Sequence, residues 1–290
     1  MTVVVLSSDR AALVAEVAAH VGSPAEARWI VEQAEATAGD GEVAGVAASL
    51  AARRRRGEPL QYVLGTWPFR TLELAVDPRV LIPRPETESV VEVALAELAA
   101  LCVVDRPAVV ADLGTGSGAI ALSLAAEGAA GGGVEVWATD RSADALAVAA
   151  ANRAAVDLVT PGVADRVHLV AGHWFDALPA GLAGRLSLVV SNPPYVSEEE
   201  FPGLDPVVRG WEPRGALVSA DGSDGTGGTA DIEAVVAAAP RWLGHPGVLV
   251  VEIAPHQEGA ALRAARSAGF GSARVERDLV GRPRTLVAVR

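Results

Sequence analysis

The sequence contains no lysine, one cysteine and few aromatic residues. All 24 basic side chains are arginine, Cys102 is the single cysteine, and aromatic residues make up 4% of the chain. One cysteine excludes an internal disulfide and is typical of a protein in a reducing compartment. Half of the 290 residues are hydrophobic, so the chain can bury a large core built mainly from alanine, valine and leucine.

Long apolar runs and positive charge are also scarce. The chain has no uninterrupted apolar run of about 18 residues, which a membrane-spanning helix needs. The first ten residues lack the basic start of a secretory signal. We therefore expect a cytoplasmic protein that does not contact a membrane. The net charge of −12 weighs against direct nucleic-acid binding. The basic run Arg53–Arg56 is a local exception, either a solvated helix end or a contact for a partner.

Residues 1–85 show two different hydrophobicity patterns, one before the other. Residues 1–64 carry apolar residues three and four apart, with Ser23-Pro24 as a capping pair, and predict a helical domain. Residues 65–85 alternate in polarity around an Asp-Pro turn and predict a β-hairpin connector that pairs residues 71–76 with 79–82.

Residues 86–290 alternate between strand and helix patterns after a first helix that runs to Cys102. This order predicts an α/β domain of Rossmann-like architecture, with a mostly parallel seven-stranded sheet covered by helices on both faces. The Gly-rich residues 219–231 are typical of a mobile loop. The expected strands are 108–114, 134–140, 166–172, 186–192, 247–254 and two within 273–290.

A glycine-rich turn, "DLGTGSGAI", follows the first of these strands. Glycines there let a ligand approach the free N–H groups at the start of the next helix. The third glycine comes one residue earlier than in a dinucleotide-binding loop. Asp140 ends the second strand, where its carboxylate can accept hydrogen bonds from two ribose hydroxyls. The pattern favours S-adenosylmethionine over NAD, the alternative being a tight turn with Asp140 capping a helix. The candidate cofactor-binding residues here are Gly114, Thr115, Gly116, Ser117, Gly118 and Asp140.

The fourth expected strand runs directly into Asn192, Pro193, Pro194 and Tyr195. Each proline removes a backbone donor, and together they stiffen the segment. The side-chain oxygen of Asn192 and the backbone carbonyl of Pro193 can accept both hydrogens of an NH₂ group. Tyr195 can pack over a planar amide. These four residues are the candidate catalytic and substrate-binding residues for a conjugated NH₂ group, which is found both in a glutamine side chain and in a nucleic-acid base.

Several motifs together resemble a known family. "DLGTGSGAIAL", "ATD" and "SNPPY", in this order, resemble class I S-adenosylmethionine-dependent methyltransferases. The stretch that ends in "IPRPETE", together with "HWFDAL", "EP…AL" and "DLVGRPR", resembles the protein-(glutamine-N5) methyltransferases that modify peptide chain release factors. The resemblance extends from about Arg53 to the end of the chain.

The resemblance implies a function and further roles. The enzyme would methylate a glutamine within a Gly-Gly-Gln motif of a release factor, which the helical segment would grip. The glycine loop would surround the methionine end of S-adenosylmethionine, and Asp140 its ribose. Trp174 would lie near the adenine, Asn192 would touch cofactor and substrate, and Ile82–Glu88 would line the substrate entrance.

Three alternatives stay open at this point. They are a glutamine methyltransferase for a ribosomal protein, an amino-methylating DNA methyltransferase, and a non-catalytic module that binds S-adenosylmethionine. The five histidines show no metal-ligand spacing, so we expect no metal. Residues 219–231 are longer and richer in glycine than the resemblance predicts, and "VVRGWEP" is less polar. Both segments are expected near the substrate entrance.

Overall fold

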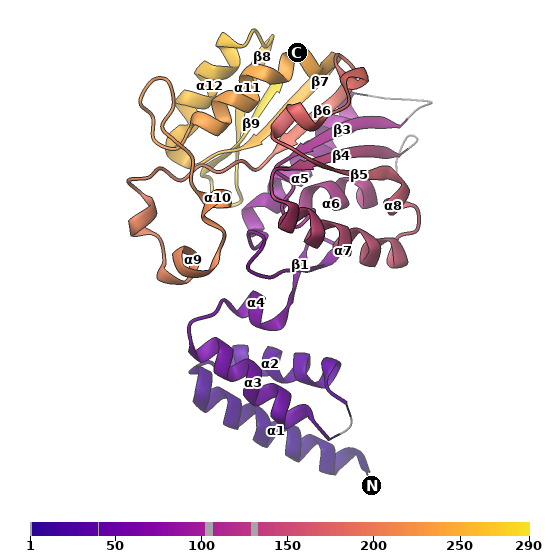
Figure 1. Ribbon diagram of the computed structural model, residues 1–290, viewed down its shortest axis with the longest axis vertical. Helices are drawn as coiled ribbons and strands as arrows, with labels where there is room; N and C mark the ends of the chain where they lie inside the picture. The colour runs from indigo at the N-terminus through magenta and orange to yellow at the C-terminus, as the bar shows by residue number, and fades with distance from the viewer. Residues whose placement is uncertain (1, 40, 102–106, 129–132) are drawn as a thin grey trace. The chain divides into compact units, whose positions relative to one another are not determined.

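The computed structural model describes the chain with four short gaps (Figure 1). The described residues are 2–39, 41–101, 107–128 and 133–290. Cys102, at the expected end of the first helix of the α/β segment, lies outside them. No helix in these ranges is long and apolar enough to cross a bilayer.

The chain divides into two units. The first comprises Met1–Trp67 and Asp205–Trp211, and the second comprises Pro68–Leu204 and Glu212–Arg290. The division lies close to the predicted end of the helical segment at residue 64, with one short segment from later in the chain added to the first unit.

A seven-stranded sheet organises the second unit. Its strand order is β5-β4-β3-β6-β7-β9-β8, in which β9 runs antiparallel to both of its neighbours and the other pairs are parallel. The mostly parallel, Rossmann-like sheet predicted from the sequence is therefore confirmed. The strands are β3 (Ala108–Leu113), β4 (Val134–Asp140), β5 (Val167–Ala171), β6 (Leu186–Ser191), β7 (Leu243–Glu252), β8 (Ser272–Arg277) and β9 (Pro283–Val289).

Helices cover both faces of the sheet. Successive strand residues point to opposite sides, so the apolar strands present a hydrophobic surface on each face that helices bury. On β6, Leu188 packs with α5, α6 and α7, whereas Val189 packs with α11 and α12 on the other face (Figure 1). The helices of this unit are α5 (Pro85–Ala100), α6 (Ala119–Glu127), α7 (Ala143–Val159), α8 (Val163–Arg166), α10 (Arg214–Leu217), α11 (Ala230–Trp242) and α12 (Glu258–Ser267). Single 3₁₀ turns are η1 (Trp174–Ala177), η2 (Ala180–Leu182), η3 (Phe201–Gly203) and η4 (Pro255–Gln257).

The central strands end level with one another. Leu113 of β3 lies opposite Thr139 of β4 and Ser191 of β6. The chain order reverses at β3, because β4 and β5 extend the sheet on one side and β6 and β7 on the other. Ligands of open α/β sheets bind at such a reversal, beyond the carboxyl ends of the strands.

The predicted hairpin exists, but its strand pairing was wrong. The hairpin consists of β1 (Thr66–Phe69) and β2 (Leu72–Ala75), joined at Arg70, whose φ is 52°. Residues 79–82 form no strand, because the Asp77 carboxylate accepts the Arg79 N–H at 3.0 Å and closes a tight turn. The N–H of Ile82 then donates to a glutamate side chain instead of a strand partner.

Helices build the first unit around small apolar residues. As predicted, Ser23 caps α2 by accepting the N–H of Glu26 at 3.3 Å, with Pro24 in the first turn. The buried core includes Ala27, Ile30, Val31, Ala34, Ala47 and Ala51. The helices are α1 (Thr2–Val21), α2 (Pro24–Thr37), α3 (Val43–Arg55), α4 (Leu60–Leu64) and α9 (Pro206–Trp211).

Two arginines of the basic run are structural. Arg53 donates to the buried carboxylate of Glu58 at 2.9 Å and to the Tyr62 carbonyl at 2.8 Å, which ties the end of α3 to α4. Arg54 donates to Glu26 of α2 at 2.6 Å. The next residue, Arg55, is exposed.

We predict that Arg53→Gln destabilises the helical unit by about 2 kcal/mol, because the buried Glu58 carboxylate loses its charged donor. Hydrogen exchange of the α2 and α3 amides measures this change. The matched variant Arg55→Gln should stay within about 0.5 kcal/mol of wild type. Equal losses in the two variants would contradict the structural role of Arg53.

Candidate active site

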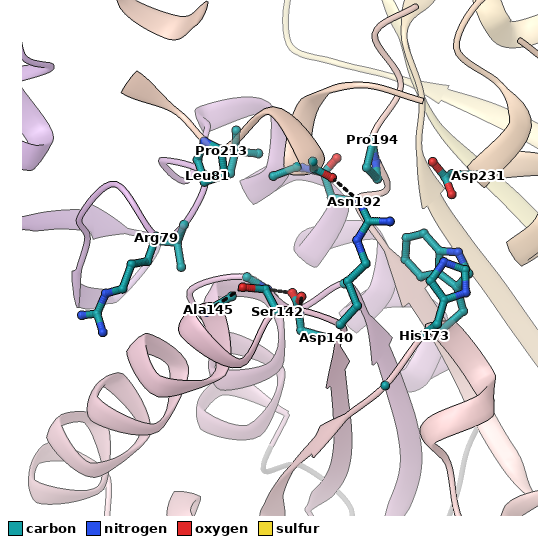
Figure 2. Close-up of a pocket in the computed structure, with 18 residues that line it drawn as sticks. Arg79, Leu81, Asp140, Ser142, Ala145, His173, Asn192, Pro194, Pro213 and Asp231 are labelled. Atoms are coloured by element: carbon teal, nitrogen blue, oxygen red, sulfur yellow. Dashed lines mark hydrogen bonds between the residues drawn. The ribbon is translucent and has the colours of Figure 1, made fainter. Parts of the chain in front are cut away.

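A cavity of about 260 Å³ lies at the carboxyl edge of β3, β4 and β6. Figure 2 shows Asp140, Asn192, Pro194 and His173 around it. The residues that line it extend from Arg79 to Asp231 in the sequence. Gly114, Asp140 and Asn192 meet there because the three strands end level. Of the predicted site residues, those that line the cavity are Gly114, Gly116, Asp140, Trp174, Asn192 and Pro194.

The glycine loop requires glycine for steric reasons. Gly114 has a φ of 76°, and a Cβ there would lie 3.0 Å from the Trp174 ring. Thr115, Ser117 and Gly118 do not line the cavity. They shape the loop instead. Thr115 donates to Asp112, the Ser117 carbonyl accepts from Asn152, and Gly118 caps α6.

Asp140 joins the glycine loop to the turn after β4, and its contact with a ribose stays a prediction. Its Oδ2 accepts the Gly116 N–H at 2.9 Å, and its Oδ1 accepts the Ser142 N–H at 2.8 Å. Ser142 itself caps α7 by accepting the N–H of Ala145. Each carboxylate oxygen keeps a second acceptor site, so Asp140 can fix the glycine loop and still accept hydrogen bonds from hydroxyls in the cavity.

Trp174 lies against the glycine loop in an uncommon backbone conformation, with a φ of 43°. Its ring centroid is 5.3 Å from that of His173. The buried indole Nε1 has no hydrogen-bond partner among the described residues. A buried donor without a partner is costly. Trp174 lines the cavity and also packs against the hydrophobic core that contains Phe175 and Val189, so its place near an adenine ring stays a prediction.

Asp112, just before the glycine loop, is fully buried. Its Oδ2 accepts from the Thr115 hydroxyl at 2.7 Å and from the Ala121 N–H at 3.1 Å, and its Oδ1 has no partner among the described residues. Burial raises the pKa of Asp112 to about 7, and the Thr115 hydrogen bond opposes that rise.

The Asn-Pro-Pro-Tyr segment leaves the end of β6, where the Ser191 hydroxyl donates to the Leu113 carbonyl at 2.7 Å. Asn192 lines the cavity, and its Nδ2 donates to the Thr87 hydroxyl at 3.1 Å. Pro193 and Tyr195 do not line the cavity. The Tyr195 hydroxyl donates to Glu252 at 3.4 Å, and burial raises the pKa of Tyr195. Packing of Tyr195 over a substrate amide stays a prediction.

The Gly-rich segment 219–231 supports this loop through specific hydrogen bonds. Gln257 Nε2 donates to the carbonyls of Tyr195 and Gly227, each at 2.9 Å. The Ser219 N–H donates to the Val196 carbonyl at 2.9 Å. A Cβ on Gly228 would lie 2.2 Å from the Tyr195 carbonyl oxygen. These bonds hold a segment that composition alone indicates to be mobile.

No residue of the "IPRPETE" stretch, Ile82–Glu88, lines the cavity, and its place at a substrate entrance stays a prediction. Arg79, Val80 and Leu81, just before Ile82–Glu88, line the cavity. The Ile82 N–H and the Arg84 guanidinium both donate to the buried carboxylate of Glu212. This pairing joins the stretch to the "EP…AL" segment, of which Pro213, Gly215 and Ala216 line the cavity.

Sequence reasoning missed Glu252 and Gln257, and it included Thr87 only as part of Ile82–Glu88. Thr87 contacts Asn192 and Glu252, whereas Gln257 contacts the Tyr195 carbonyl. Thr87, Glu252 and Gln257 are all buried. Glu252 ends a strongly apolar strand, as Asp140 does, and this was a signal that could have drawn attention to it. Within the described ranges no group of three or more His, Cys, Asp or Glu side chains is placed to hold a metal ion.

Comparisons with known proteins identify relatives that cover about 80% of the chain. Residues 94–202 match the family model of the methyltransferase small domain. A release factor glutamine methyltransferase of Gloeobacter violaceus is 42% identical over 238 residues, covering 81% of this chain and 76% of that protein. One of Pseudomonas aeruginosa is 43% identical over 237 residues, covering 80% of this chain and 76% of that protein. A methyltransferase structure from Pyrococcus furiosus, 15% identical with a TM-score of 0.50, covers 76% of this chain and 89% of that chain and shows the fold alone.

We predict that Gly228→Ala lowers the free energy of unfolding by about 3 kcal/mol, because the left-handed conformation and the clash with the Tyr195 carbonyl both add cost. Gly225 is a matched control, since its φ is +80° and a Cβ there meets nothing within 4 Å. Gly225→Ala should cost only about 1 kcal/mol. Equal costs in denaturant unfolding would show that segment 219–231 does not pack on the Tyr195 loop.

Proposed function

This chain belongs to the release factor glutamine methyltransferase family, and we propose that it methylates the side-chain amide nitrogen of a glutamine in a peptide chain release factor. The methyl donor in this proposal is S-adenosylmethionine. The observation that carries it is that Asn192 and Pro194 line the same cavity as Gly114 and Asp140. A methyl donor bound by the glycine loop and a glutamine amide bound by Asn192 would therefore lie in the same cavity.

The cavity suits the proposed cofactor. Gly114, Asp140 and Trp174 all line it, and the Asp140 carboxylate keeps acceptor sites beyond its two backbone donors. When bound, S-adenosylmethionine supplies a methyl group on a positively charged sulfur, and the sulfur keeps the electron pair of the broken bond.

A carboxamide nitrogen is a weak nucleophile, because its lone pair is delocalised into the carbonyl group. Methyl transfer to it therefore depends on holding the nitrogen in line with the methyl group. The Asn192 Oδ1 can accept one N–H of the glutamine amide. The second acceptor expected from the sequence is the carbonyl of Pro193, a buried residue that does not line the cavity. The nitrogen gains the bond to carbon and releases one proton to water. No strong base is needed, since the nitrogen becomes acidic only as the new bond forms.

In this proposal the release factor also binds to the helical unit. Trp29 of α2 is 46% exposed and contacts Trp67 edge to face at 6.0 Å. Arg55 and Arg56 are exposed at the end of α3. Aromatic rings and arginines are both enriched in protein-binding patches, and this unit exposes side chains of both kinds. We assign recognition of the release factor to this unit and expect the reaction to occur in the cytoplasm.

Transfer of labelled methyl groups tests the choice of substrate. The protein is incubated with labelled S-adenosylmethionine and, in separate reactions, with unmethylated release factor, ribosomal proteins or duplex DNA. We predict label on one release factor glutamine, located by mass spectrometry. Label on DNA or on a ribosomal protein would overturn the proposed substrate, and cofactor binding without any label would indicate a binding module.

Asn192→Ala tests the role of the amide acceptor in the same assay. We predict a loss of roughly 100-fold or more in transfer rate, because the target nitrogen is no longer aligned. Affinity for S-adenosylmethionine should stay within roughly tenfold of wild type, because at most one hydrogen bond to the cofactor is lost. Glu199→Ala, at an exposed position further along the same loop, should transfer at the wild-type rate. Near-normal transfer by Asn192→Ala would contradict the acceptor role.

A further inference from the structure

Two buried residues form a hydrogen-bonded chain behind Asn192. Asn192 Nδ2 donates to the Thr87 hydroxyl at 3.1 Å, and that hydroxyl donates to Glu252 Oε2 at 2.7 Å. Thr87 lies in the first turn of α5 and Glu252 ends β7, 165 residues later. Their exposed fractions are 4% and 0%, and neither lines the cavity.

The direction of this chain follows from the number of protons. A threonine hydroxyl has one hydrogen, and an ionised carboxylate can only accept. The Thr87 hydrogen therefore points to Glu252, and its lone pairs are left for Asn192. Only the NH₂ end of the Asn192 amide can donate to those lone pairs, so the network assigns the orientation of the amide.

That orientation has a chemical consequence. With Nδ2 bound to Thr87, the Oδ1 atom is the end of the Asn192 amide that remains for a ligand in the cavity. An NH₂ group of a substrate needs an acceptor there. In the reversed orientation an NH₂ would face an NH₂, and the two could not pair.

We propose that Thr87 and Glu252 are positioning residues that fix the Asn192 carboxamide with its oxygen toward the substrate amide. This inference rests on the proposed function and goes beyond it, because neither residue touches the cavity. The pair acts through Asn192 and transfers no proton to or from the substrate.

The surroundings of Glu252 make this orientation sensitive to pH. Burial raises the pKa of Glu252 to about 7. The positive charge of Arg284 on β9 opposes this rise, Glu86 on α5 adds to it, and the hydroxyls of Thr87 and Tyr195 donate to the carboxylate. Once protonated, Glu252 can donate to Thr87, whose hydrogen is then free to turn to Asn192. That hydrogen favours the reversed amide.

Thr87→Val and Thr87→Ser test the positioning role with little change in volume. Valine keeps the shape without the hydroxyl, and we predict a roughly tenfold lower kcat, the effect of one lost hydrogen bond. Serine keeps the hydroxyl and should restore most of kcat. KM for the release factor, and the dissociation constant of S-adenosylmethionine measured by calorimetry, should change less than twofold in both variants, roughly the experimental scatter.

The outcomes separate this inference from the proposed function. A wild-type enzyme that does not methylate release factor overturns the function itself. If the wild type is active and Thr87→Val keeps its kcat, the positioning role is overturned. A parallel loss in Thr87→Val and Thr87→Ser also overturns it, because a merely structural effect would not depend on the hydroxyl.

The pH profile of kcat at saturating cofactor tests the role of Glu252. For the wild type we predict a fall of roughly tenfold from about pH 8 to about pH 6, as Glu252 becomes protonated. Glu252→Gln should lose this acid limb, because its amide oxygen accepts from Thr87 at every pH. Asp112→Asn is the matched control, since it removes another buried carboxyl whose pKa burial raises to about 7, and it should keep the limb. A limb that persists in Glu252→Gln or disappears in Asp112→Asn would overturn the role of Glu252.

Discussion

The carboxyl group of Glu252 has no exposure to solvent. The organisation of the site depends on the hydrogen-bond donors and the positive charge that replace water around this carboxyl group. A buried carboxylate is costly unless donors replace water. Here the donors are the hydroxyls of Thr87 and Tyr195, and Arg284 supplies a nearby positive charge. These groups come from α5, the Asn-Pro-Pro-Tyr loop and β9, so one carboxyl joins three separate elements around Asn192.

The two halves of the cavity are held by different kinds of force. On the glycine-loop side the constraint is steric, since Gly114 lies where a Cβ would meet Trp174. On the Asn192 side the constraint is hydrogen bonding through Thr87. The level ends of β3, β4 and β6 bring the two sides together. A reaction that depends on alignment rather than on a strong base suits such a rigid arrangement.

The sequence predicts the sheet, the glycine loop and the Asn-Pro-Pro-Tyr loop because each is a local pattern. The hairpin prediction paired residues 71–76 with 79–82, whereas β2 pairs with β1. The alternating polarity of β2 does not indicate which neighbouring segment it pairs with. The Thr87–Glu252 contact spans 165 residues and depends on the folded sheet, so no local pattern reveals it. The position of Glu252 at the end of an apolar strand was a visible signal, but its partners were not.

The most direct test of the account is a crystal structure of the protein with S-adenosylhomocysteine and a Gly-Gly-Gln peptide. Our account predicts that the glutamine nitrogen lies within hydrogen-bond distance of Asn192 Oδ1, with Asn192 Nδ2 still bound to Thr87. A glutamine that binds away from Asn192, or an Asn192 amide that presents its NH₂ group to the peptide, would contradict it.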